Sequence, residues 1–179
     1  MRLSLQGKLS VRDLTIFAML GAIMFMSRLL MAMIPNVHVL GLFIASITIT
    51  YRTRALIPIY VFVLLDGVYW GFSIWWMPYL YVWLPLWFTF MIAGKVNLPL
   101  KVQAPLYMVL CALHGLSFGT LYAPAHAFFF RLSFQGMLAW IAAGLPFDVI
   151  HAIGNFAAAT LIIPLTALLK KLDRGQIVT

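Results

Sequence analysis

The sequence predicts an all-α integral membrane protein: a bundle of six transmembrane helices with both termini in the cytoplasm. Three observations predict this class, namely the composition, the length of the apolar segments and the distribution of positive charge. Apolar residues make up 64% of the 179 positions and charged residues only 9%, against about 25% charged residues in a typical soluble domain. Because no segment of soluble composition interrupts the apolar ones, residues 1–179 are expected to form a single membrane domain.

The first three helices are bounded by proline and by arginine. A spanning helix needs about 20 largely apolar residues. Residues 12–34 supply such a run, and Pro35 ends it; since the run has no small-residue cleavage site, it is expected to be a retained helix rather than a signal peptide. Residues 37–51 form a short second helix, closed by the basic segment 51–54. The third helix covers residues 54–71.

Proline also bounds the last three helices. Residues 78–94 follow an aromatic turn, and residues 104–123 are expected to stop before Pro124. The sixth helix is predicted at residues 144–170, because Pro146 suits the first turn of a helix, where its missing N–H is not needed.

Residues 126–143 are long enough for a seventh span, but Arg131 and Gln135 would then lie near mid-membrane. Cytoplasmic loops carry an excess of Lys and Arg, and seven spans would put the basic C-terminal cluster outside. Six spans leave Arg131 as the one basic residue of the outer loops and make 126–143 an interfacial or re-entrant segment on the outer side, between helices 5 and 6. The inner loops then hold Arg2, Lys8, Arg12, Arg52, Arg54, Lys95, Lys101, Lys170, Lys171 and Arg174.

Charge and motifs exclude several functions. A net charge of +8 suggests nucleic acid in a soluble protein, but here the basic clusters lie between apolar runs and fit anchoring to a lipid bilayer, with no nucleic-acid partner. The single Cys111 excludes an internal disulfide, and with His114 it gives too few ligands for a standard metal site. No G-x-x-x-x-G-K-[ST] loop is present, so the chain cannot hydrolyse ATP by that route, and transport would need a gradient or a partner.

Aromatic residues concentrate on the predicted outer face. Five of the six tryptophans lie in residues 70–87. An interfacial aromatic belt predicts aromatic residues at both membrane surfaces, whereas the inner loops are poor in tryptophan. This asymmetry favours a wall on which a planar ligand stacks. The candidate ligand-binding residues are Tyr69, Trp75, Trp76, Tyr79 and Trp83, with His38 from the turn between helices 1 and 2.

Three ionisable residues lie in the outer halves of predicted helices: Arg28, Asp66 and Asp148. A charge at a helix centre costs about 2.5–3.5 kcal/mol on insertion scales, so it needs a partner or a function. An Arg28–Asp66 ion pair that holds helices 1 and 3 together and a role in binding are both open. Asp148, His151 and Asn155 fall at i, i+3 and i+7, on one helix face, and form a candidate polar stripe for ligand binding.

Two further motifs involve small residues. Gly115-Leu116-Ser117-Phe118-Gly119 matches the nucleophile-elbow pattern, but that pattern requires a strand–turn–helix setting. An intramembrane serine hydrolase that uses Ser117 and His151 is the alternative, enzymatic function; the expectation is a protein with no catalytic residues. Ala18 and Ala22, at i and i+4 in the cytoplasmic half of helix 1, let another helix approach closely.

These features together resemble a known family. A chain of this length with six helices, both ends inside, an Ala-x-x-x-Ala in helix 1 and no ATPase motif resembles the substrate-binding S component of energy-coupling factor (ECF) vitamin transporters. The stretches PNVHVLGLFIA, RALIPIYVFVLLDGVYWGFSIWWMPYLYVW and GLPFDVIHAIGN are also similar to members of that family.

The resemblance implies a non-enzymatic, high-affinity vitamin-binding subunit in the bacterial plasma membrane. It implies that Ala18 and Ala22 pack on the transmembrane coupling subunit, that two cytoplasmic ATPase subunits use the ATP, and that substrate binds near the outer face. The S component is expected to topple in the membrane to deliver its vitamin.

Among vitamin types, the chain is most similar to the cobalamin-binding S components. The residues Asn36, His38, His126, Gln135 and Asn155 give the outer site amides and imidazoles but few positive charges. Such a lining suits a large ligand with apolar faces and neutral amides better than a dianion. Riboflavin, which is flat and neutral, suits the tryptophans too and is the alternative, as is another vitamin. No covalently bound cofactor is expected.

Overall fold

The computed structural model describes residues 9–34 and 36–173. Within these residues the chain is helical and contains no strand. Four stretches are long and apolar enough to cross a membrane, and a shorter apolar stretch covers Met77–Ala93. The prediction of an all-helical protein is confirmed, and the four apolar stretches support its being a membrane protein. The predicted features at Arg2, Lys8, Pro35 and Arg174 lie outside the described residues.

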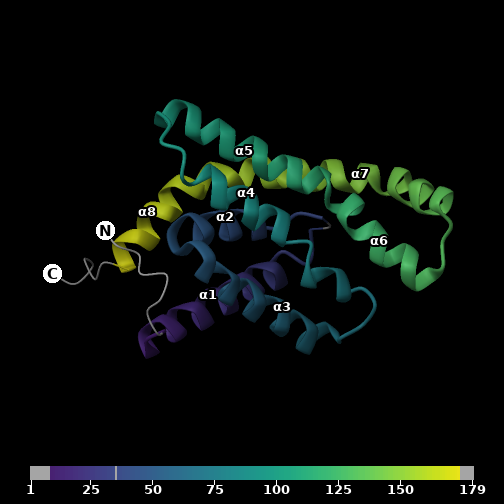
Figure 1. Ribbon diagram of the computed structural model, residues 1–179, viewed down its shortest axis with the longest axis horizontal. Coiled ribbons are helices and arrows are strands. Elements are labelled where there is room, and N and C mark those ends of the chain that lie inside the picture. The colour runs from purple at the N-terminus through teal and green to yellow at the C-terminus, as the bar shows by residue number, and fades with distance from the viewer. Residues whose placement is uncertain (1–8, 35, 174–179) are drawn as a thin grey trace.

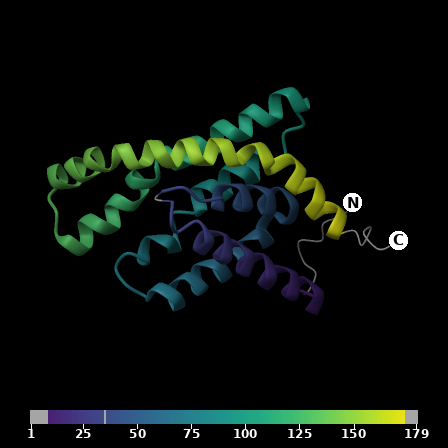
Figure 2. The same cartoon turned by 180° about the vertical axis from the view of Figure 1, so that it is seen from behind.

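The helices follow one another with short connections (Figure 1). Their order is α1 (Val11–Leu30), α2 (Leu40–Tyr51), η1 (Arg52–Ala55), α3 (Leu56–Trp70), η2 (Met77–Leu80), α4 (Leu84–Ala93), α5 (Leu100–Leu116), α6 (Phe118–Phe130), α7 (Phe134–Ala158), η3 (Ala159–Leu161) and α8 (Ile162–Asp173). Seen from behind, α7 and α8 form one long run along an edge of the molecule (Figure 2).

The start of α1 carries a capping box. The Asp13 N–H donates to Ser10 Oγ at 3.1 Å, and the Ser10 N–H donates to Asp13 Oδ2 at 3.0 Å. This exchange satisfies two backbone donors that a helix start leaves unpaired. Further along, α1 packs closely on α3 at Gly21, where a Cβ would lie 2.5 Å from Val61 Cγ1. A larger residue at Gly21 would therefore push the two helices apart.

The second helix lies at the centre of the bundle. Eleven of the twelve residues of α2 are buried, and the helix contacts α1, α4, α5, α7 and α8. A helix that is apolar on all sides is expected to be enclosed by others. The core around α2 is therefore built from the inward faces of the longer helices.

Two predicted helix boundaries at proline are wrong. Pro124 lies inside α6 and Pro146 inside α7; membrane helices tolerate such prolines because neighbouring groups satisfy the freed backbone positions. The actual start of α7 is capped by Ser133, whose Oγ accepts from the Gly136 N–H at 3.1 Å. Residues 126–143 are thus no separate interfacial segment: they are the end of α6 and the start of α7, joined by a tight turn at Arg131, which adopts a left-handed conformation with φ 53°.

Several helix ends meet where both ends of the described chain lie (Figure 1). Arg12 Nη2 donates to the carbonyls of Leu172 and Asp173 at 3.1 Å each, which joins the start of α1 to the end of α8. Arg54 forms an ion pair with Asp13 at 3.7 Å, and Arg52 donates to the Met91 carbonyl at the end of α4. We call this region the basic end; its basic residues are Arg12, Arg52, Arg54, Lys95, Lys101, Lys170 and Lys171.

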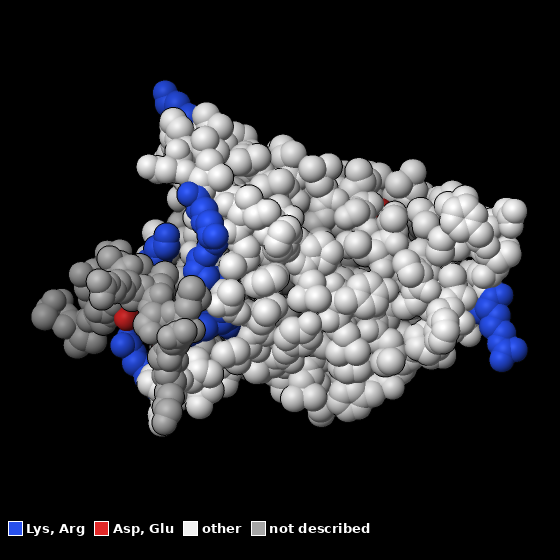
Figure 3. Space-filling view, viewed as in Figure 1, with Lys and Arg blue, Asp and Glu red and all other residues white. Residues whose placement is uncertain are grey.

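The opposite end of the molecule is formed by the turn between α6 and α7. On the face seen in Figure 3, blue Lys and Arg side chains gather at the end that carries both termini, and one more lies at the far end. Between the two ends the visible surface is uncharged apart from a trace of one acidic side chain. Such a surface fits a bilayer core bounded by a basic side.

Candidate functional site

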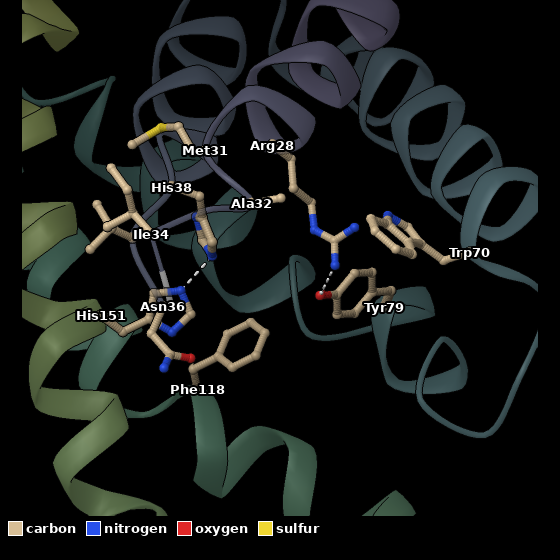
Figure 4. A pocket seen from close by; sticks show the side chains of 11 residues that line it. Arg28, Met31, Ala32, Ile34, Asn36, His38, Trp70, Tyr79, Phe118 and His151 are labelled. Carbon is tan, nitrogen blue, oxygen red and sulfur yellow. Dashed lines mark hydrogen bonds between the residues drawn. The ribbon is translucent and has the colours of Figure 1, made fainter.

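A cavity of about 370 Å³ lies where the last turn of α1 meets α3, η2, α6 and α7 (Figure 4). Ligand pockets in proteins usually measure about 300–1,000 Å³, so this one is at the small end of that range. We call it the aromatic cavity. Its lining residues are Arg28, Met31, Ala32, Ile34, Asn36, Val37, His38, Trp70, Tyr79, Phe118 and His151.

The segment between α1 and α2 forms one wall of the aromatic cavity. It turns on successive backbone hydrogen bonds, from the Ile34 N–H to the Met31 carbonyl at 2.9 Å and from the Val37 N–H to the Ile34 carbonyl at 3.3 Å. Asn36 takes a left-handed conformation with φ 58°, which asparagine tolerates better than most residues. The turn therefore brings an irregular segment, which carries the polar residues Asn36 and His38, to the cavity.

Two histidines from distant parts of the chain meet at this wall. His38 and His151 share a hydrogen bond between their Nε2 atoms, and their ring centroids are 4.3 Å apart. One ring must donate and the other accept, so at least one of them is neutral. Burial, and next the neighbouring His151, lowers the pKa of His38 well below its usual value of 6.5. The pair therefore contains at least one neutral imidazole and lines the cavity with two ring edges.

His38 also has an unused polar atom. Its Nδ1 is buried and has no hydrogen-bond partner within residues 9–34 and 36–173. Nδ1 is a donor in one tautomer and an acceptor in the other, so either tautomer leaves one hydrogen bond unmade. A buried polar atom without a partner is costly, and a ligand group or a water molecule would remove that cost.

A charged cluster forms the opposite wall. Arg28 makes an ion pair with Asp66, which confirms that these two residues are partners. Arg28 Nη2 also donates to the Tyr79 hydroxyl at 3.2 Å, and the guanidinium lies 5.4 Å from the centroid of the Tyr79 ring (Figure 4). Asp66 is 3% exposed, whereas the side chain of Arg28 is 27% exposed and lines the cavity. The pair thus joins α1 to α3 and offers a guanidinium to the cavity at the same time.

The predicted aromatic wall is only partly at the cavity. Tyr79 lines it, together with Trp70 and Phe118, which the sequence reasoning did not select. Trp83 is 2% exposed and packs behind the lining, with ring centroids 5.5 Å from Tyr79 and 6.1 Å from His38. Trp83 therefore supports the wall from the core.

The remaining predicted aromatics point elsewhere. Trp76 Nε1 donates to the Val63 carbonyl at 2.8 Å, and Tyr69 packs on Phe25 at 5.5 Å between ring centroids. Trp75 stacks on the Tyr122 ring at 6.3 Å, and its carbonyl accepts from the Tyr122 hydroxyl. Trp75 and Trp76 thus fasten the connection between α3 and η2 to its neighbours, whereas Tyr69 packs α3 on α1.

The polar stripe of α7 is a buried face, as its spacing predicted: Asp148, His151 and Asn155 are the buried residues of this helix. Of the three, His151 alone is among the lining residues of the aromatic cavity. Asp148 Oδ1 accepts from the Gly119 N–H at 3.0 Å and so caps the start of α6. A Cβ at Gly41 or Gly115 would lie 2.9 Å from the Asn155 side chain, which places Asn155 where α2, α5 and α7 pack closely.

Two more polar residues considered from the sequence lie away from the cavity. His126 stacks on Trp140 with ring centroids 4.5 Å apart, between α6 and α7. Gln135 is exposed in the first turn of α7. Neither is a lining residue.

Within residues 9–34 and 36–173, Ser117 and His151 are hydrogen-bonded to partners other than each other. Ser117 Oγ donates to the His114 carbonyl at 3.1 Å, and His151 is bonded to His38. His114 in turn is bonded through Nε2 to the Val82 carbonyl at 2.9 Å. Cys111 is buried, and the described residues contain no group of three or more His, Cys, Asp or Glu side chains that could hold a metal ion.

The small residues of α1 lie on the outside of the bundle. Ala18 is exposed and Ala22 half-buried, and exposed Met19, Ile23 and Met26 surround them. On the adjacent face of α1, Gly21 packs on α3.

Comparisons of the chain with models of known protein families, with curated proteins and with solved structures find no significant match.

Proposed function

We propose that this chain is the vitamin-binding S component of an ECF-type importer. The observation that carries the proposal is the aromatic cavity: rings, imidazoles and one guanidinium converge on a hollow inside an apolar helix bundle. This lining can hold a ligand by stacking and hydrogen bonding. A binding protein needs nothing more, and the Ser117 hydroxyl already has a partner in its own helix.

We propose six spans with both termini in the cytoplasm. Arg52 ends α2 with φ 59°, which separates α2 from α3. In this arrangement α2 runs from the aromatic cavity, near His38, to the basic end at Arg52, and α3 returns to the aromatic cavity at Trp70. The two helices are thus antiparallel passes. α1, η2–α4, α5–α6 and α7–α8 supply the other four passes. The positive-inside rule then assigns the basic end to the cytoplasm and the aromatic cavity to the outer half of the bacterial plasma membrane.

Two observations bear on the identity of the ligand: the sequence resemblance and the volume of the aromatic cavity. Cobalamin is the vitamin that the sequence resemblance favours, but it is much larger than a typical drug-sized ligand, and a volume of about 370 Å³ favours riboflavin or another small vitamin. Binding of cobalamin would require a larger cavity than this one. Arg28 and the paired histidines fit a ligand with hydrogen-bond acceptors beside a planar ring.

The proposed partners are the transmembrane coupling subunit and two cytoplasmic ATPase subunits that use ATP. The outward position of Ala18 and Ala22 supports the first of these, because small side chains allow the backbones of two membrane helices to approach closely. In this proposal α1 is the docking helix, and the chain itself binds the vitamin but not ATP.

A thermal-shift screen of the purified protein against the water-soluble vitamins tests the proposal. A ligand at a hundredfold excess over its dissociation constant stabilises the native state by about 2.7 kcal/mol. One vitamin should raise the melting temperature without being chemically changed, and uptake into vesicles should require ATP and the partner subunits. Normal uptake by this chain alone, or turnover that Ser117→Ala abolishes, would overturn the proposal.

Point variants then test whether the ligand binds in the aromatic cavity. His151→Ala removes a lining residue and should weaken binding by roughly threefold to thirtyfold, the equivalent of one hydrogen bond or ring contact. Lys95→Ala at the basic end is the control and should bind like the parent protein. Asp148→Asn and Asn155→Ala should act mainly on thermal stability. If His151→Ala behaves like the control while folded, the ligand binds elsewhere.

A further inference from the structure

A second cavity, of about 210 Å³, lies at the basic end between α2, α5 and α8. We call it the basic-end cavity. Ile49 and Ile163 give it an apolar floor, and its polar lining comes from Gln103 and Tyr107 of α5 and from Thr166 and Lys170 of α8. It lies at the other end of the bundle from the aromatic cavity and shares no residue with it.

Three donors converge on this cavity. Thr166 Oγ1 is buried and finds no hydrogen-bond partner in the part of the chain that the structure describes. The Tyr107 hydroxyl accepts from Gln103 Nε2 at 2.9 Å, which leaves its own proton to be donated. Lys170 adds an ammonium group at the exposed rim. An acceptor with several oxygens would satisfy all three.

The charges around the cavity select an anion. Arg52 lies close enough to Tyr107 to interact with it electrostatically, so a second cation lies near the cavity. Among the described residues no carboxylate lines the cavity; the nearest acidic residue along α8 is Asp173, one turn beyond Lys170. A phosphate group is therefore the ligand chemistry that fits.

We propose that the basic-end cavity binds the phosphodiester headgroup of an anionic phospholipid. Basic pockets between membrane helices on the cytoplasmic side bind such headgroups. The surface beside the cavity suits acyl chains, because Leu100 and Val102 of α5 and Leu168 of α8 are exposed apolar side chains. A free phosphate ion would use the donors but not this surface, which favours the lipid. The proposal does not rest on the identity of the transported ligand.

The test measures thermal stability of the full-length protein in detergent micelles with added phosphatidylglycerol, with phosphatidylcholine, or with inorganic phosphate. Phosphatidylglycerol should stabilise more than an equal amount of phosphatidylcholine, and native mass spectrometry should detect it bound. Lys170→Gln should weaken phosphatidylglycerol binding by about fivefold, the effect of one Lys near an anionic lipid. Lys171→Gln, the adjacent lysine outside the cavity lining, is the matched control and should not change it.

A second variant distinguishes an effect on lipid binding from an effect on the stability of the protein. Thr166→Val keeps the side-chain shape and removes the unpartnered hydroxyl, so without lipid it should melt at the same temperature as the parent protein or higher. With phosphatidylglycerol it should gain less stability than the parent. Equal losses in Lys170→Gln and Lys171→Gln would overturn the proposal, as would equal stabilisation by both lipids. Stabilisation by inorganic phosphate as large as that by phosphatidylglycerol would overturn it in favour of a free anion.

Discussion

Single charged and polar side chains decide the chemistry of this bundle. Arg28 and Asp66 were recognisable from the sequence because an isolated charge in an apolar helix is expensive and needs a partner, and the structure pairs them. The hydrogen bond between His38 and His151 had no such signal. The two residues are 113 positions apart, and only the packing of α7 against the turn between α1 and α2 brings them together.

The lining residues that the sequence reasoning missed have a common cause. Trp70 and Phe118 are apolar residues in apolar surroundings, so no property of the residue itself marks them. Trp70 is the last residue of α3 and Phe118 the first of α6. Rings at helix ends can turn into a cavity between helices, but the sequence does not show which ends will meet.

Arg28 can be tested for its two roles separately. Arg28→Gln leaves Asp66 buried without its partner, and breaking a buried pair costs about 3–5 kcal/mol, so the variant should melt at a lower temperature. Adding Asp66→Asn removes the unpaired charge and should restore most of the stability. If Arg28 contacts the ligand, the double variant should still bind the vitamin roughly tenfold to hundredfold more weakly, the value of a charged hydrogen bond. Binding at the parent level in the double variant would show that the pair only joins α1 to α3.

At the scale of helices, apolar length was the dependable signal and proline was not. The starts and ends of α1, α2 and α3 fall within about four residues of the predicted ones, because turns and charged segments interrupt the apolar runs there. Pro124 and Pro146 were read as boundaries, although both lie within helices. In water a proline inside a helix costs about 3 kcal/mol, but between membrane helices the alternative, an open backbone in lipid, is worse.

The outer face of α1 is the element whose function can be tested most directly. Ala18→Trp puts a large ring on the proposed docking face, and overpacking of this kind costs about 1–3 kcal/mol, or roughly five- to 150-fold weaker association. The variant should co-purify poorly with the coupling subunit and transport poorly, yet bind its vitamin normally. Val109→Trp, at an exposed position of α5, is the control. Normal assembly of Ala18→Trp would exclude this face, and loss of vitamin binding would mean that Ala18 supports the bundle interior.

At the scale of the whole molecule, the basic residues are distributed as the predicted topology requires. The basic residues of four different connections and helix ends gather at one end, while Arg131 lies at the other. This pattern was readable from the sequence because the positive-inside rule depends on loop composition and not on packing. The two cavities were not readable, since each arises where three or more helices meet.

The proposed orientation predicts which ends of the molecule a reagent can reach. Cys111 is buried and is the single cysteine of the chain, so Cys111→Ser gives a background without reactive thiols. In that background, Arg131→Cys, at the turn between α6 and α7, should react with a membrane-impermeant maleimide added to intact cells. Lys95→Cys, between α4 and α5, should react only after the cells are permeabilised, because the hydrocarbon core blocks the charged reagent. Labelling of both variants from the same side would mean an even number of passes between positions 95 and 131 and would refute the six-span arrangement. Labelling of Lys95→Cys alone in intact cells would mean the reverse orientation, with the aromatic cavity in the cytoplasmic half.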